Sequence, residues 1–144
     1  MTTEHEHEAP VARTRNGEIT LDQLGEIQPG MARLMMEVSD RYWIAYYAAK
    51  AGNWRLASHE LGELKKAFGV ANVTRPKYAG DLTGFASETM ADLDRALKAK
   101  DWAAFDRSFQ GSVAAINALH AKWGHGEIVW QLPAEPPKHL KLEP

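Results

Sequence analysis

The chain has 144 residues, of which 44% are hydrophobic and 25% are charged, proportions that are ordinary for a globular protein of one domain. Its 17 basic and 19 acidic residues give a net charge of −2, which leaves no broad positive surface for a nucleic acid. No apolar run approaches the ~20 residues that a membrane-spanning helix needs. We therefore expect a protein that contacts neither nucleic acid nor membrane.

The N-terminal segment, residues 1–19, is predicted to be a disordered tail. It is polar, contains Pro10 and shows no periodicity in its apolar residues. His5 and His7 could hold a divalent metal only loosely, and a solvated acidic tail is the preferred interpretation. Because the first residues lack the positive and apolar regions of a secretory signal, we expect a cytoplasmic location.

Two helices are predicted in the first half of the chain. The first runs from Pro29 to Ala51, where apolar residues recur at steps of three and four and proline suits the first turn. The second runs from Trp54 to about Phe68, with Asn53 as its N-cap and Gly69 as its end.

Two more helices are predicted in the second half. The third begins at Pro76–Tyr78, and its apolar stripe consists of Tyr78, Leu82, Phe85, Thr89, Leu93 and Ala96. The fourth follows Asp101, which is a good N-cap, and closes at Gly124 and Gly126.

The spacing of these helices predicts an all-α fold. The junctions Lys50–Trp54 and Lys98–Trp102 are short and similar, so each joins neighbouring helices into an antiparallel hairpin. Residues 20–131 should therefore form an antiparallel four-helix bundle. Residues 132–144 contain four prolines and are expected to form an extended tail.

An unusually dense aromatic cluster lies on the first predicted helix. The cluster of Tyr42, Trp43, Tyr46 and Tyr47 exceeds what one helix face can bury, so one monomer should not bury all four rings. Exposed aromatic rings often mark a partner surface, and we predict a homodimer through this helix. The alternative is a wide apolar face beneath the C-terminal tail or the 70–77 linker.

The fourth helix ends in the sequence Ile116-Asn117-Ala118-Leu119-His120, which is followed by Gly124-His125-Gly126. With cysteine at 116 and 119 this would be C-x-x-C-H, the attachment motif of c-type haem. Both thiol positions are aliphatic, and the chain contains no cysteine at all. A thioether bond to haem is therefore excluded.

These residues carry a resemblance to a known family. The degenerate motif, the Ala-Gly-Asn-Trp turn at 51–54 and the Leu-x-x-His-Glu-Leu run from Leu56 to Leu61 resemble the cytochrome c-prime-like and related four-helix-bundle cytochromes. The resemblance covers about residues 24–130. It implies a bundle that binds haem near the end of its fourth helix, with His120 at the position of the proximal iron ligand.

A non-covalent haem site is one interpretation of His120. A neutral imidazole on the inner face of a bundle can ligate haem iron without a thioether, and Met31 or Met35 could supply the second axial ligand. The other interpretation is a partly buried histidine with local hydrogen bonds, beside methionines that fill the core. A His120/His125 pair could bind a metal only with a carboxylate such as Glu127 nearby.

Motifs of hydrolases, phosphate-binding loops and di-iron bundles are absent from the sequence, so we expect no enzymatic activity and no obligate cofactor. The preferred hypothesis is a binding or interaction module with a protein partner or a small apolar ligand. Its pocket would lie near His120, with Ile116, Leu119, Met31 and Met35. The alternative is a b-type haem protein for electron transfer, haem carriage or gas sensing.

Overall fold

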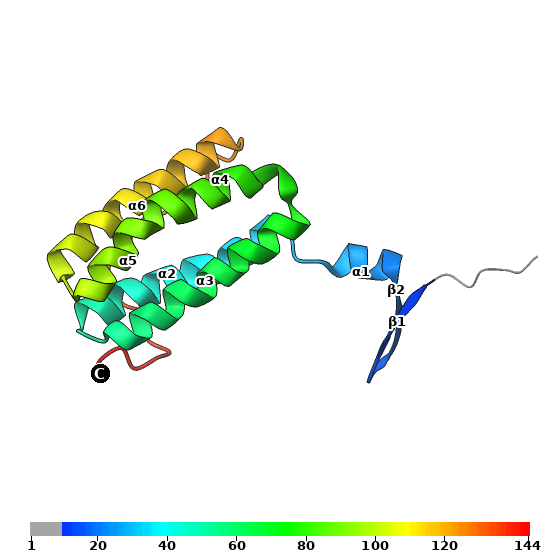
Figure 1. The fold of residues 1–144 in the computed structure, drawn as a ribbon, viewed down its shortest axis with the longest axis horizontal. Coiled ribbons are helices and arrows are strands. Elements are labelled where there is room, and N and C mark those ends of the chain that lie inside the picture. The colour runs from blue at the N-terminus through cyan, green and yellow to red at the C-terminus, as the bar shows by residue number, and fades with distance from the viewer. Residues whose placement is uncertain (1–9) are drawn as a thin grey trace, which may run out of the picture.

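The computed structural model describes residues 10–144, which are mostly helical and contain one small two-stranded sheet. Figure 1 shows two parts, a helical body of long helices lying side by side and an N-terminal arm that projects from one end of it. We use "helical body" for residues 31–144 and "arm" for residues 10–28. Within the described residues no helix combines the length and the apolar character that crossing a bilayer requires.

The arm is a β-hairpin followed by a short helix. Strands β1 (Val11–Thr14) and β2 (Gly17–Thr20) pair antiparallel across the two-residue turn Arg15-Asn16, and α1 spans Leu21–Ile27. Thr20 caps α1, because its side chain accepts from the backbone N–H of Gln23. The prediction of a disordered tail is therefore wrong for residues 11–19, and residues 1–9 lie outside the described part.

The first two long helices are α2 (Met31–Lys50) and α3 (Trp54–Thr74), and they pack along each other. Asn53 caps α3 as the sequence indicated, by accepting from the backbone N–H of Leu56. The predicted end of this helix at Gly69 is wrong, because the helix continues for another turn. A helical glycine costs only about 1 kcal/mol, and burial of Ala71 beyond it offsets that cost.

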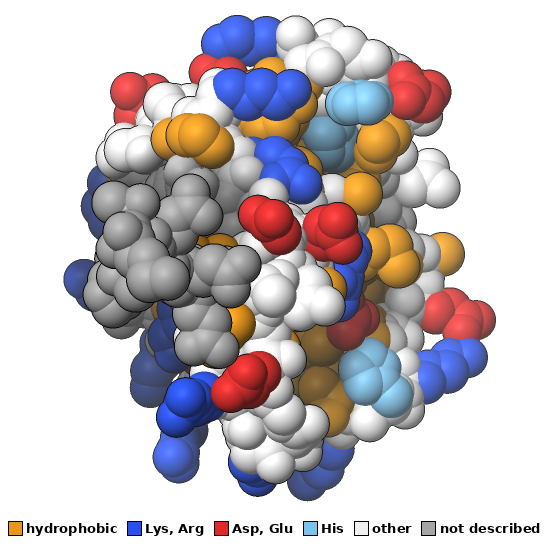
Figure 2. Space-filling model, turned by 90° about the vertical axis from the view of Figure 1, so that its right-hand side faces the viewer, with side chains coloured by type: hydrophobic (Ala, Val, Ile, Leu, Met, Phe, Trp, Pro, Cys, Tyr) orange, Lys and Arg blue, Asp and Glu red, His pale blue; other side chains and the backbone are white. Residues whose placement is uncertain are grey.

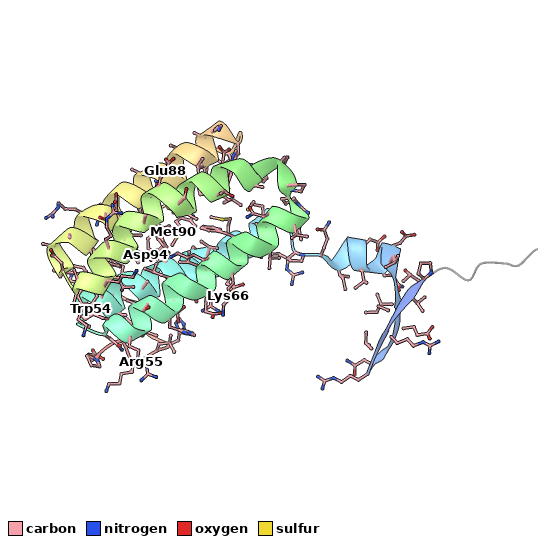
Figure 3. The ribbon with its side chains drawn as sticks, viewed as in Figure 1. Trp54, Arg55, Lys66, Glu88, Met90 and Asp94 are labelled. Atoms are coloured by element: carbon pink, nitrogen blue, oxygen red, sulfur yellow. The ribbon has the colours of Figure 1, made fainter. Side chains whose placement is uncertain are left out.

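The third predicted helix is continuous but irregular. It consists of the 3₁₀ turn η1 (Pro76–Tyr78), α4 (Ala79–Gly84), the π-helical segment η2 (Phe85–Thr89) and α5 (Met90–Ala99). The Met90 N–H donates to the Phe85 carbonyl five residues back, so the segment holds one extra residue. Met90 consequently takes the buried place predicted for Thr89, and Figure 3 shows it on the inner side of the helix, opposite Glu88.

The last helix, α6 (Trp102–Lys122), is capped by Asp101, which accepts from the backbone N–H of Ala104. After Gly124, at φ +84°, the chain turns back and runs along the body without further helix or strand. It is tied down where the Tyr47 hydroxyl donates to the Pro133 carbonyl and where Asn53 donates to the Glu143 carbonyl at 3.3 Å. We call residues 125–144 the C-terminal segment.

The aromatic cluster of α2 is enclosed by the chain itself. Tyr42 and Tyr46 are buried and pack on Phe109, with ring centroids at 4.5 and 4.7 Å. The half-buried rings of Trp43 and Tyr47 lie under the C-terminal segment, against Trp130 and the Pro133 carbonyl. The contacts favour the alternative of an apolar face beneath the C-terminal segment, with Trp43 and Tyr47 half-buried, and the homodimer through Tyr42, Trp43, Tyr46 and Tyr47 stays a prediction.

Candidate ligand-binding site

An apolar groove of about 370 Å³ lies at the end of the helical body where α2 begins and α6 ends. This volume is within the range of about 300–1,000 Å³ that small-molecule sites occupy. Figure 2 views this end of the molecule and shows histidine side chains beside apolar ones near the top. The groove is lined by Met31, Ala32, Met35, Met36, Ser39, Tyr78, His120, Trp123, His125, Ile128 and Trp130.

One wall of the groove is formed by methionines. Met31, Met35 and Met36 come from the first two turns of α2, and Met36 is 75% exposed. Methionines that fill a core are enclosed, whereas these three border open space. Because a methionine side chain is unbranched and its sulfur is polarisable, such a wall can adapt to apolar ligands of different shape.

His120 lies on the opposite wall, near the end of α6, and is only 5% exposed. Its Nδ1 is 3.0 Å from the Ile128 carbonyl oxygen, so the Nδ1–H donates to that carbonyl and the tautomer is fixed. Burial lowers the pKa of His120 below its ordinary value, and proximity of His125 lowers it further. His120 is therefore neutral at pH 7, with the lone pair on Nε2.

The C-terminal segment supplies the third wall. Trp130 and Asn117 make a reciprocal pair, in which the Trp130 N–H donates to Asn117 Oδ1 at 2.7 Å and Asn117 Nδ2 donates to the Trp130 carbonyl at 2.9 Å. This pair places the Trp130 ring beside His120, with ring centroids 5.8 Å apart. Asn117, the second residue of the degenerate haem motif, thus positions the segment that covers the groove.

Trp123 is held at the end of the groove by a hydrogen bond to Asp81 of α4. Its Nε1–H donates to Asp81 Oδ2 at 2.9 Å, while the Lys122 ammonium contacts Asp81 Oδ1 at 2.7 Å. These two bonds hold the pKa of Asp81 below its ordinary value, because both favour the carboxylate. The Trp123 ring also packs on Tyr78, with centroids 4.4 Å apart.

His125 folds back towards His120, since its backbone N–H donates to the His120 carbonyl at 2.8 Å. Its ring pairs with Glu127 at 3.2 Å and stays exposed. Even so, residues 10–144 hold no group of three or more histidine, cysteine, aspartate or glutamate side chains arranged to bind a metal ion. The His120, His125 and Glu127 combination considered from the sequence is therefore not assembled.

The structure brings together three of the five residues predicted to form a pocket, namely His120, Met31 and Met35. Ile116 and Leu119 instead contribute to an almost filled void of about 10 Å³ behind His120, and Ile116 is buried. Sequence reasoning missed Trp130 and Ile128, because they lie between the predicted end of the fourth helix at Gly126 and the predicted tail at 132–144, where no helix or strand was expected. The signal that could have found them is the apolar run Ile128–Trp130 before Pro133.

Comparison of the chain with protein-family models, curated proteins and solved structures gave no match. The resemblance to cytochrome c-prime-like proteins therefore stays a prediction that rests on the sequence motifs.

Proposed function

We propose that this protein is a non-enzymatic binding module, built on an antiparallel four-helix bundle of the cytochrome c-prime-like kind, that takes a small apolar ligand in the groove beside His120. The observation that carries the proposal is the composition of the groove. Three methionines, two tryptophans and an isoleucine surround an open space with few polar groups. Ligand sites typically combine mostly apolar walls with a few polar groups that orient the ligand.

The polar groups of the groove indicate what kind of ligand it would favour. His120 presents a neutral imidazole with Nδ1 occupied by the Ile128 carbonyl. A free Nε2 lone pair accepts a hydrogen bond, so an apolar molecule with one hydroxyl or N–H donor fits best. A purely hydrocarbon ligand would leave this acceptor unpartnered, which costs free energy in an apolar site.

The experiment is a titration of the full chain with N-phenyl-1-naphthylamine, a dye whose fluorescence rises in apolar sites. Ala32→Trp places a large ring in the groove, whereas Ala114→Trp makes the same change at an exposed position of α6 that does not line it. We expect saturable binding to the parent and to Ala114→Trp, and its loss in Ala32→Trp. Equal dye affinity of the parent and Ala32→Trp would contradict the proposal.

A second candidate function is non-covalent haem binding, and one observation favours it. The Nδ1–H of His120 is held by a backbone carbonyl, which is the arrangement that orients metal-ligating histidines and leaves Nε2 for the metal. Met31 and Met35 line the same groove, so His120 and one thioether could serve as the axial ligands of a haem iron. Bound haem would supply electron-transfer or gas-binding chemistry.

Haemin titration separates the two candidates. If haem is the ligand, the parent and His59→Ala should show a sharp Soret band, because His59 is exposed on α3, and His120→Ala should not. If the parent shows no specific Soret band but binds the dye, the apolar-ligand proposal stands alone. Equal haem spectra for the parent and His120→Ala would rule out His120 as the iron ligand.

A further inference from the structure

The arm carries an apolar helix face that no other residue of the described part, 10–144, covers. Leu21, Leu24 and Ile27 of α1 are 57%, 38% and 59% exposed. Successive residues turn by 100° around a helix, so these three side chains fall within an arc of about 120°. Asp22 and Glu26 lie on the opposite side. Helix α1 is therefore amphipathic and lacks an apolar partner surface.

The arm is too small to be stable without a partner. A lone two-stranded hairpin is marginal in water, and isolated helices shorter than about 12–15 residues are marginal as well. Helix α1 has seven residues and buries none of them, and its main contact is with β2. Figure 3 shows the side chains of the arm standing clear of the helical body. A partner that covered the apolar face would stabilise the arm in this structure.

The connection between arm and body directs α1 away from its own groove. Gln28 has ψ 141° and Gly30 has φ −85° and ψ 168°, so both are extended, and Pro29 between them is rigid. Arg75 fixes the connection by donating from Nη1 to Gln28 Oε1 at 3.2 Å. Folding α1 onto the groove of the same chain would require this connection to reverse.

The groove offers the surface that α1 lacks. Amphipathic helices bind apolar grooves through residues at three- and four-residue spacing, and methionine-rich walls adapt to such helices. Met36 and Ile128, which line the groove, are 75% and 44% exposed, so the apolar wall is accessible to a partner. The groove of one copy and the apolar face of α1 of another are both left open in residues 10–144, so each is the complement that the other lacks.

We infer that α1 of a second copy of this chain docks its Leu21, Leu24 and Ile27 face into the apolar groove, and that the exchange is reciprocal. Each copy has one arm and one groove, so a two-fold dimer satisfies both at once. The inference rests on the proposed function, because it assigns a partner to the same groove. A small apolar ligand and the arm of the second copy then compete for one site.

Disulfide trapping tests this arrangement. Because the chain contains no cysteine, only the introduced thiols can form a disulfide. Leu24→Cys and Met36→Cys variants are mixed, oxidised mildly and analysed by intact mass, which separates mixed dimers from dimers of one variant. The control replaces Leu24→Cys by Asp22→Cys, on the opposite side of α1. We expect the mixed dimer to be several-fold more abundant with Leu24→Cys. Equal yields from the two arm variants would overturn the inference.

The double variant Leu24→Cys/Met36→Cys distinguishes a second copy from the same chain. Oxidation should give covalent dimers. A disulfide within one monomer would show that the arm folds back on its own groove, which contradicts the inference.

Sedimentation with dye titration separates failure of the inference from failure of the proposed function. The parent should be a dimer at tens of micromolar. The control Arg55→Asp lowers the net charge by two, as Leu21→Asp/Leu24→Asp does, but at an exposed site of α3, and it should also be a dimer. Leu21→Asp/Leu24→Asp should be a monomer that binds the dye more tightly, because no arm competes. A parent that is monomeric yet binds the dye would overturn the inference and leave the proposed function standing.

Discussion

The two ends of the helical body are built from the same helices but are packed in opposite ways. At the end where α2 and α3 meet, Trp54 packs edge-on against Phe105, and Tyr46 packs against Trp102 with ring centroids 5.2 Å apart. At the other end the side chains facing one another are methionines, histidines and the rings of Trp123 and Trp130, and a groove remains between them. The first end is closed, and the second is open.

The difference shows how side-chain type decides where the helical body keeps open space. Rigid rings fill the closed end and leave their few polar atoms satisfied, as in the bond between the buried Tyr42 hydroxyl and Ser112. Burial raises the pKa of Tyr42 and raises that of Tyr46 to about 12, so both stay neutral hydroxyl donors. Flexible methionines at the open end leave the space adaptable.

The largest expected effect comes from breaking the packing of the buried rings. Phe109→Ala removes a fully buried ring that contacts Tyr42, Trp43 and Tyr46, and should lower the free energy of unfolding by about 3–5 kcal/mol. Met35→Ala at the groove should cost less than about 2 kcal/mol, since a half-buried side chain leaves no closed cavity. Urea denaturation followed by circular dichroism measures both. Equal losses would contradict the contrast between packed and open regions.

A smaller effect is expected from restoring the thiol positions. Ile116→Cys with Leu119→Cys removes aliphatic volume from the nearly filled void behind His120, and should cost about 1–3 kcal/mol in total. The measurement is the urea midpoint under reducing conditions, with Ala118→Cys as an exposed control on the same helix. A double variant as stable as the parent would show that these side chains do not contribute to the core.

Removing a cap tests the closed end more gently. Asp101→Ala leaves the N–H of Ala104 without its side-chain acceptor, and should lower the free energy of unfolding by about 1 kcal/mol. Asp101→Asn keeps an acceptor and should cost a few tenths at most, about 0.3 kcal/mol. The pair is compared by thermal unfolding. A loss of the same size in both variants would indicate that charge, rather than the hydrogen bond, stabilises the helix.

The smallest effect concerns the pH dependence of the open end. The pKa of His120 is lowered in the folded protein, so between that pKa and about 6.5 the unfolded chain binds the proton more readily. Stability from this group is complete above pH 6.5 and is lost as the pH falls below it. We expect the melting temperature of the parent, relative to His120→Gln, to decrease from pH 7 to pH 5.5. A constant difference would contradict the assigned direction of the shift.

Much of the helical body could be predicted from local sequence signals. Asn53 and Asp101 precede helices as caps, and the stripe Val38, Tyr42, Ala45 and Ala49 marks the buried face of α2. The change of the buried position from Thr89 to Met90 could not be predicted. A π-helical turn is stabilised by tertiary packing, and no amino-acid composition marks it reliably in a sequence. The hairpin at 11–20 was missed because its side chains bury almost nothing, which leaves no hydrophobic alternation to detect.

The candidate site was predictable only in part. Topology brings the start of the first long helix near the end of the last, so Met31, Met35 and His120 could be placed together from the sequence. The third wall depends on the reciprocal bonds between Asn117 and Trp130, which join residues of a helix and an irregular segment. Irregular segments have no periodicity, so their contacts cannot be inferred from spacing.

The π-helical turn at Phe85–Thr89 also determines where this chain can change in length. An α-helix advances by 100° per residue, so deleting one residue elsewhere in α4 or α5 would rotate every later side chain away from the core. Deleting one residue within the π turn would instead return it to regular α-helix while both flanking halves keep their inward faces. We therefore expect that, when this chain is aligned with homologous sequences, deletions of one residue occur mainly at this turn.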